Sequence, residues 1–234
     1  MGAMRSSRFF TQHGRPAWAR VLLAALGLVV VVFYFFRRIW VSMRLGGWID
    51  SVDMPAYQWA LGHQNPVLQG ASTALFYWGS TPGMVITLLL IALLLCWYAR
   101  SWWPLAVIAF TAAVSTSLTS ILKAVLEVPR PHGVPGGPEP PASFSMPSGH
   151  TLNAAALVGI AVYLAVMYGL RRYAWLMGTI AALFVAAMGA SRIYLGHHWV
   201  SDVVMGLCIG LAWGAVVAIL HYCFVPAGSR RAIR

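Results

Sequence analysis

The stretch VSDVVMGLCIGLAWGAVVAILHYCF, residues 200–224, contains a single formally charged side chain, that of Asp202. With a rise of about 1.5 Å per residue, a helix of this length is long enough to cross a hydrocarbon core of about 30 Å. Inside lipid the backbone polar groups must bond within their own segment, which only a helix provides for a single run of chain. We therefore predict a transmembrane helix over these residues.

Five further apolar runs precede this one in the chain: about 21–36, 84–98, 103–122, 151–170 and 173–190. The second run has an alternative start near Leu75. Hydrophobic residues make up 60% of the chain and charged residues 9%, whereas a soluble domain carries about 25% charged residues. The sequence thus predicts an all-α integral membrane protein with six transmembrane helices. These form one domain over residues 21–224, between cytoplasmic tails at 1–20 and 225–234.

The distribution of arginine and lysine predicts the orientation. With the N-terminus inside, the inner segments hold ten of these cations and the outer segments six. Positive charge gathers on the cytoplasmic side, so both termini are predicted there. The net charge of +11 then reflects topology and contact with anionic lipid, and nucleic acid is not an expected partner.

Two long outer connections separate the runs. Residues 41–73 include Trp48, Tyr57 and Trp59 among polar residues, which fits either a helix lying in the membrane interface or an irregular loop with interfacial aromatics. Residues 129–147 are rich in proline and glycine, so they cannot be helical throughout.

Polar groups gather at the outer ends of the last four runs. The topology brings three such groups to one face: Lys123 with Arg130, the sequence PSGH at 147–150, and Arg192 with His198 and Asp202. Each cation alone is more simply explained as an anchor at the membrane surface. Together with a hydroxyl and a glycine at a helix N-terminus, they predict a receptacle for phosphate.

Two histidines complete this group. His198 and Asp202 lie four residues apart, so on a helix the carboxylate can orient one ring nitrogen and leave the other free to attack. The corresponding partner of His197 is Ser201, a weaker orienter, and no catalytic role is assigned to His197. His150 lies beside the phosphate receptacle, where it could donate a proton to a leaving oxygen. No cluster of carboxylates is available to hold a metal, so no metal or other cofactor is predicted.

These residues resemble the three-part signature of the type 2 phosphatidic acid phosphatase superfamily. The matching parts are Lys123-(x6)-Arg130-Pro131, Pro147-Ser148-Gly149-His150 and Ser191-Arg192-(x5)-His198-(x3)-Asp202. The resemblance implies that His198 forms a phosphohistidine, that Asp202 orients it and that His150 protonates the leaving group. It also implies a metal-independent reaction in which the phosphate oxygens are held by Lys123, Arg130, Ser148, Gly149 and Arg192.

The expected function is hydrolysis of a lipid phosphate at the periplasmic or extracellular face of the membrane, which is expected to be a bacterial inner membrane. Phosphatidic acid, phosphatidylglycerophosphate and a polyprenyl diphosphate all fit as substrates. A phosphotransferase that passes the phosphate to another lipid or a sugar would use the same first step. A non-catalytic lipid-binding or transport protein is the third alternative, although it leaves the nucleophile, its orienter and the acid unexplained. No obligate protein partner is predicted beyond the bilayer and its lipid.

Overall fold

The computed structural model describes residues 27, 30–42, 47 and 49–224, and this part of the chain contains helices and no strand. Residues 30–42 are helical. The helices that follow are α2 (Asp50–Gly62), α3 (Pro66–Gly79), α4 (Thr81–Ala99), α5 (Trp103–Leu126), α6 (Gly149–Ala165), α7 (Ala174–Tyr194) and α8 (Val200–Phe224). The predicted all-α fold is confirmed over these residues.

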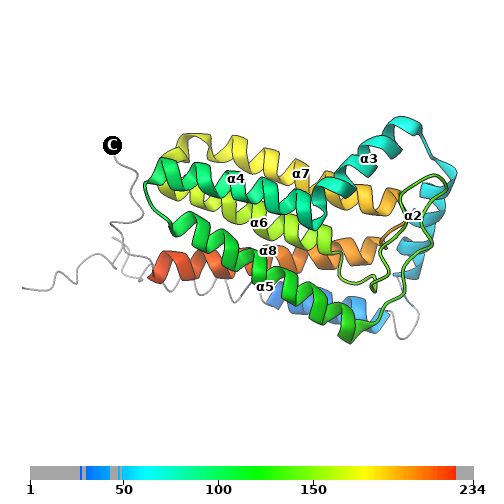
Figure 1. The fold of residues 1–234 in the computed structure, drawn as a ribbon. Helices are drawn as coiled ribbons and strands as arrows, with labels where there is room; N and C mark the ends of the chain where they lie inside the picture. Colours follow the sequence, from blue (N-terminus) through cyan, green and yellow to red (C-terminus); the bar gives the residue numbers. More distant parts are fainter. Residues whose placement is uncertain (1–26, 28–29, 43–46, 48, 225–234) are drawn as a thin grey trace, which may run out of the picture.

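Four stretches of the described chain are long and apolar enough to cross a membrane: 81–99, 103–126, 149–194 and 200–224. The third stretch reverses direction at Gly169, where φ is 122°, so that α7 packs alongside α6 (Figure 1). It therefore supplies two of the predicted runs. Half of the first predicted run, 21–36, lies outside the described residues, as do the whole of the predicted tails 1–20 and 225–234. A total of six spans stays a prediction.

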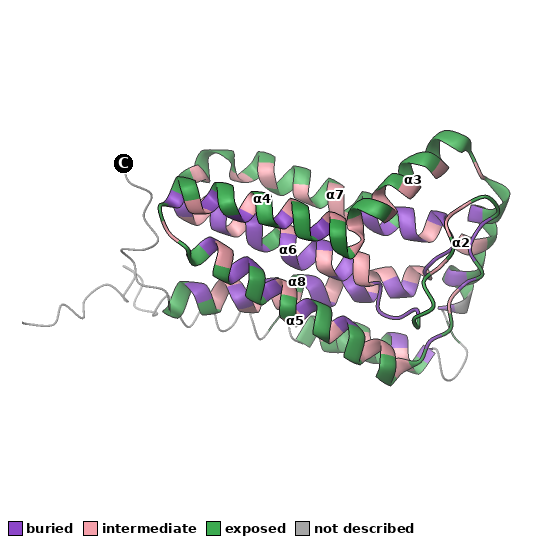
Figure 2. Cartoon of the chain, in the orientation of Figure 1, coloured by how far each residue is buried: buried purple, intermediate pink, exposed green. Residues whose placement is uncertain are grey.

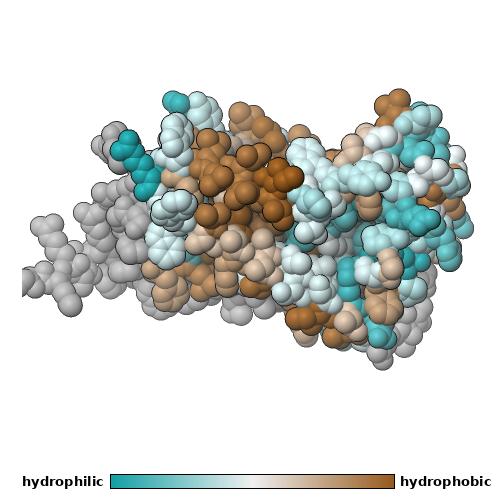
Figure 3. All heavy atoms as spheres, in the orientation of Figure 1, coloured by the Kyte–Doolittle hydropathy of each residue, from teal (hydrophilic) through white to brown (hydrophobic). Residues whose placement is uncertain are grey.

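An apolar surface covers the middle of the long helices on the face drawn in Figure 3. Figure 3 shows hydrophobic side chains over the middle of the bundle, with more hydrophilic side chains toward both ends. Leu90 and Leu94 in α4 and Leu183 in α7 are each more than half exposed. A face of this kind is stable against lipid and unfavourable against water, which agrees with an integral membrane protein.

The segment between the first two predicted spans forms two helices, where one interfacial helix or an irregular loop was expected. Asn65 separates α2 from α3, and its side chain accepts hydrogen bonds from the first backbone N–H groups of α3. The alternative start of the second span near Leu75 is wrong, because Leu75 belongs to α3 and α4 begins only at Thr81. Ser80 is extended and Pro82 follows in the first turn of α4, a combination that interrupts a continuous helix.

Helix α6 is the centre of the bundle and contacts α4, α5, α7 and α8. Ten of its 17 residues are buried, and Figure 2 shows the buried positions concentrated along it. Gly206, Gly210 and Gly214 recur every four residues along α8 and face the backbone of α6. Small residues at this spacing allow two helices to approach closely.

This packing brings four helix ends together. The C-terminal ends of α5 and α7 and the N-terminal ends of α6 and α8 lie at one end of the bundle, where α2, α3 and the connection 127–148 cover them (Figure 1). Helix α2 packs on α7 and α8, while α3 packs chiefly on α7. The polar groups predicted to share a face are therefore carried to the same end of the molecule.

Candidate active site

His198 and Asp202 form a buried pair at the start of α8. Nδ1 of His198 lies 3.1 Å from Oδ2 of Asp202. The same carboxylate oxygen accepts the backbone N–H of Trp199 at 2.9 Å and a hydrogen bond from the Ser145 hydroxyl. His198 lies just before the helix, which begins at Val200. The carboxylate reaches back to the chain entering the helix, as acidic residues in a first helical turn commonly do.

The other ring nitrogen of His198 faces a cation. Nη1 of Arg130 lies 2.9 Å from Nε2 of His198. A guanidinium has only donors, so Nε2 must present its lone pair and the ring proton must lie on Nδ1, toward Asp202. Burial, together with the charges of Arg130 and Lys123, lowers the pKa of His198 well below its usual value of 6.5. The imidazole is therefore neutral at pH 7, with a nucleophilic lone pair on Nε2.

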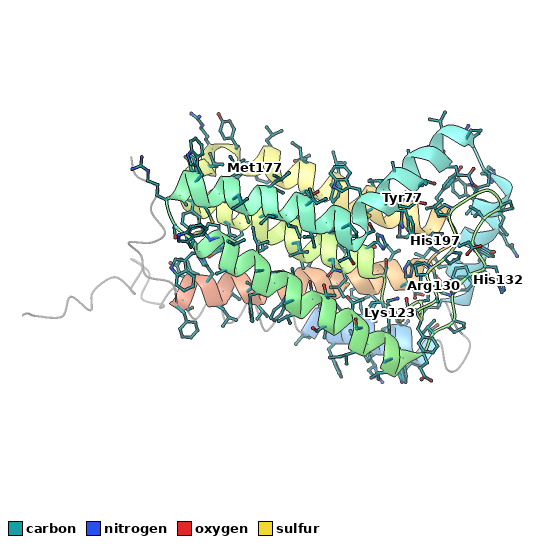
Figure 4. All side chains as sticks on the ribbon, viewed as in Figure 1. Tyr77, Lys123, Arg130, His132, Met177 and His197 are labelled. Carbon is teal, nitrogen blue, oxygen red and sulfur yellow. The ribbon has the colours of Figure 1, made fainter. Side chains whose placement is uncertain are left out.

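The backbone of residues 143–145 and 197 holds two of the three predicted cations. Nζ of Lys123 donates to the carbonyl oxygens of Phe144 and, at 3.1 Å, Ser145. Arg130 donates to the carbonyl oxygens of Ser143 at 2.6 Å and His197 at 2.7 Å. Burial lowers the pKa of Arg130, although the usual pKa of a guanidinium is so high that the group remains charged. Figure 4 shows Lys123, Arg130 and His197 together at the covered end of the bundle.

Arg192, the third cation, is completely buried. Its Nη2 donates to the carbonyl oxygen of Ser72 in α3 at 3.0 Å, and its guanidinium carbon lies 5.1 Å from the centre of the Phe76 ring. Nη1 has no hydrogen-bond partner among the described residues. Buried donors are usually paired, so this atom marks Arg192 as ready to receive an anion.

The cations and histidines surround a cavity of about 160 Å³. It is lined by Phe76, Lys123, Arg130, Pro141, Ser143, Gly149, His150, Arg192, His197 and His198. Such a volume suits a phosphoryl group better than a whole lipid. Three cations and one lone-pair imidazole around this space can bind a phosphate dianion and attack its phosphorus atom.

Six of the eight predicted site residues line the cavity: Lys123, Arg130, Gly149, His150, Arg192 and His198. Asp202 lies behind His198, as expected for an orienting group. Ser148 is buried and its hydroxyl lies 3.0 Å from that of Thr151. It does not line the cavity, so a phosphate contact from its side chain stays a prediction.

A family model described as the PAP2 superfamily matches residues 101–225. The chain belongs to the PAP2 superfamily. The resemblance inferred from the three motifs is thereby confirmed. The matched residues run from the start of α5 to the end of α8 and include every predicted site residue.

Relatives of this PAP2 protein share most of its length. It is 28% identical over 184 residues to phosphatidylglycerophosphatase B of Bacillus subtilis (strain 168), covering 78% of this chain and 89% of that protein. A crystal structure of a transmembrane PAP2 type phosphatidylglycerolphosphate phosphatase from Bacillus subtilis matches with a TM-score of 0.75 and 25% identity. That match covers 86% of this chain and 96% of the other. Aquifex aeolicus LpxE matches with a TM-score of 0.54 and 22% identity over 70% of this chain and 93% of the other, which shows a shared fold.

Three groups outside the predicted set also shape this PAP2 site. The Ser145 hydroxyl contacts both Asp202 and, at 3.3 Å, Nδ1 of His198. Phe76 supplies a wall of the cavity. Asp53 in α2 accepts hydrogen bonds from the backbone N–H of Ser201 at 2.9 Å and from its hydroxyl at 2.6 Å, next to Asp202. Burial raises the pKa of Asp53.

These three groups carried little signal in the sequence. Ser145 lies three residues before Ser148, and a second hydroxyl this close to a phosphate motif could have been considered. Phe76 and Asp53 lie in a region without a motif, and only the packing of α2 and α3 on the other helices brings them to the site.

Proposed function

We propose that this chain hydrolyses phosphatidylglycerophosphate at the outer face of the inner membrane through a phosphohistidine on His198. That the chain is a lipid phosphatase follows from its family and from its relatives. The finer proposal rests on one observation above the others: Arg130 faces Nε2 of His198, so this nitrogen carries a lone pair. The relative that matches over 89% of its length is a phosphatidylglycerophosphatase, which favours this lipid over phosphatidic acid or a polyprenyl diphosphate.

The reaction takes two displacements at phosphorus. Nε2 of His198 attacks the phosphorus atom, the bond from phosphorus to the glycerol oxygen breaks, and His150 gives a proton to that oxygen. A water molecule then attacks the phosphohistidine and gives its proton to His150. The N–P bond breaks, inorganic phosphate leaves, and His150 is again protonated. Asp202 stabilises the positive charge that develops on His198 in the first step.

The three cations stabilise the negative charge on the transferring group. Arg130 would exchange its contact with Nε2 of His198 for a phosphate oxygen, which frees the lone pair at the moment of binding. The unpaired Nη1 of Arg192 supplies a further donor. Electrostatic stabilisation of this kind is often the largest single contribution to catalysis.

Purified full-length protein in detergent micelles tests the mechanism. With phosphatidylglycerophosphate labelled with ³²P in its terminal phosphate, acid-labile and base-stable label should appear on the protein and then as free phosphate. His198→Ala should abolish both signals, while His63→Ala, which changes an exposed histidine directly after α2, should leave both intact. Unchanged phosphate release by His198→Ala would refute the nucleophile assignment.

The same assay distinguishes the substrates and the alternative reaction. Phosphatidic acid and a polyprenyl diphosphate, supplied at equal concentration, should be hydrolysed more slowly than phosphatidylglycerophosphate. If the label passed to an added lipid or sugar acceptor and no free phosphate appeared, the reaction would be phosphotransfer and not hydrolysis.

A further inference from the structure

The last turn of α3 lies against the imidazole of His150. The backbone carbonyl oxygen of Phe76 lies 3.2 Å from Nε2 of His150. The ring of Phe76 stacks on the imidazole, with centroids 5.7 Å apart and an angle of 18° between the planes. One residue therefore fixes both the plane of the imidazole and the direction of one of its nitrogens.

This contact also determines which nitrogen of His150 can deliver a proton. A carbonyl oxygen only accepts, so Nε2 of His150 must carry its proton for the hydrogen bond to form. The second proton of the imidazolium then lies on Nδ1. No protein partner of Nδ1 is found in the described part of the chain. Nδ1 is therefore the atom available to a leaving oxygen.

Gly79, three residues after Phe76, makes room for the same ring. A Cβ atom at this position would lie 2.5 Å from Cδ2 of His150 and 2.9 Å from the thioether end of Met188. The end of a methionine side chain can move aside, but the imidazole is held by Phe76. A side chain at position 79 would therefore displace His150.

The Phe76 ring contacts two more groups at the wall of the cavity. The guanidinium of Arg192 lies over its face at 5.1 Å, and the ring of His197 meets it edge-on at 5.2 Å. A guanidinium over an aromatic face is stabilised electrostatically, and more strongly where water is excluded. The same ring thus sets the distance between the proposed proton donor and a phosphate-binding cation.

From these contacts we propose that Phe76 and Gly79 are positioning residues for proton donation by His150. They hold the imidazole so that Nδ1 faces the bond that breaks. The proposal rests on the proposed function, in which His150 protonates the leaving oxygen. It assigns to α3, which lies outside the PAP2 match at residues 101–225, a part in the reaction.

Two esters with different leaving groups test this role. The lipid alcohol is a poor leaving group and needs a proton, whereas p-nitrophenolate leaves without one. General acid catalysis contributes about 10²- to 10⁴-fold, so partial misplacement of the donor should remove part of that factor. Phe76→Leu and Gly79→Ala should lower kcat for phosphatidylglycerophosphate by about 10- to 100-fold. Because the second step, in which His150 takes a proton from water, is common to both esters, the first step is compared by single-turnover release of each leaving group. Release of p-nitrophenolate should change much less than release of the lipid alcohol, and His150→Ala should show the same selectivity with a larger loss.

The same helix offers matched controls. Gly70→Ala places its Cβ where no atom lies within 4 Å, and Val67→Ala changes a side chain that is 77% exposed. Both should retain normal rates with both esters. Phe76→Tyr keeps the ring and should restore most of the lipid activity that Phe76→Leu loses. Thermal unfolding midpoints near that of the unchanged protein would confirm that the variants fold.

A second measurement needs only the lipid substrate. The high-pH limb of kcat reports loss of the proton from the general acid in the enzyme–substrate complex. This limb should flatten in Phe76→Leu and Gly79→Ala, because the rate no longer depends on the protonation of His150 once its imidazole is misplaced. Equal losses in the single-turnover first step with both esters, or an unchanged limb together with normal lipid turnover, would overturn the positioning role. Failure of the proposed function is distinct, because the unchanged protein would then release no phosphate from the lipid.

Discussion

Replacing Gly206 with alanine should separate the two halves of the active site. An added Cβ would lie 2.7 Å from the carbonyl oxygen of Ser148 and 3.3 Å from the backbone nitrogen of Leu152. That oxygen already accepts the Leu152 N–H at 2.9 Å in the first turn of α6, and the Ser148 N–H donates to the Asp202 carbonyl at 3.0 Å. Backbone atoms held in this way cannot step aside.

The size of the effect follows from the distances. The contact of 2.7 Å falls about 0.7 Å short of the 3.4 Å at which ordinary packing begins. The start of α8, which carries Asp202, must therefore move away from the start of α6, which carries His150. A misplacement of about 1 Å in a catalytic group can lower the rate about 10²-fold, so we expect a loss of about 10- to 100-fold in kcat. Overpacking of this kind also lowers the free energy of unfolding by about 1–3 kcal/mol.

Phosphate release from phosphatidylglycerophosphate and the thermal unfolding midpoint measure the two effects. Gly159→Ala in α6 is the control, because nothing lies within 4 Å of its added Cβ. It should keep normal activity, and the midpoint should stay the same or rise, since alanine is the better helix former. If Gly206→Ala turned over within about twofold of the unchanged protein, the spacing of α6 and α8 would not control the site.

Three further predictions concern charge. Asp53→Ala should lower the thermal unfolding midpoint and reduce kcat about 3- to 10-fold, because Ser201 loses both of its acceptors beside Asp202; the exposed Glu139→Ala should change neither value. Burial lowers the pKa of His197 to about 4 from its usual 6.5. Between pH 6.5 and pH 4, His197 is therefore protonated in the unfolded chain but still neutral in the folded protein. The free energy of unfolding should therefore decrease below about pH 6.5 by up to about 1.4 kcal/mol per pH unit for this group, and His197→Gln should reduce the slope in pH-dependent urea denaturation. Activity should persist in excess EDTA, because cationic side chains meet the charge of the phosphate; a loss that Mg²⁺ or Zn²⁺ restores would contradict this.

The long helices could be predicted from the sequence because lipid leaves the chain few choices. An apolar run must be helical inside the bilayer, and the sixth predicted run coincides with α8 at both ends. The short helices were harder. Helices α2 and α3 are amphipathic at most, and the end of α3 depends on the extended Ser80 and on Pro82. Ser80 and Pro82 could have predicted the break between α3 and α4, but the apolar residues on both sides made one continuous helix the simpler interpretation.

The contact between His198 and Asp202 could also be predicted, since their spacing of four residues brings the two side chains together. The groups that support the site could not. Lys123, Arg130 and His150 are oriented largely by backbone carbonyl oxygens. Every residue has such an oxygen, so the sequence does not show which of them will face a cation.

The use of carbonyl oxygens explains why so basic a site occurs in a chain with so few acids. Three cations around one small cavity repel one another, and carboxylate partners would relieve the repulsion by cancelling the charge. Carbonyl dipoles stabilise Lys123 and Arg130 while the net charge at the cavity stays positive. The two buried carboxylates described at this end of the molecule are engaged elsewhere, Asp202 with His198 and Asp53 with Ser201. If the cavity binds phosphate as proposed, a phosphate dianion that enters it meets cations that are positioned but not neutralised. Binding would then require no ion pair within the protein to be broken first.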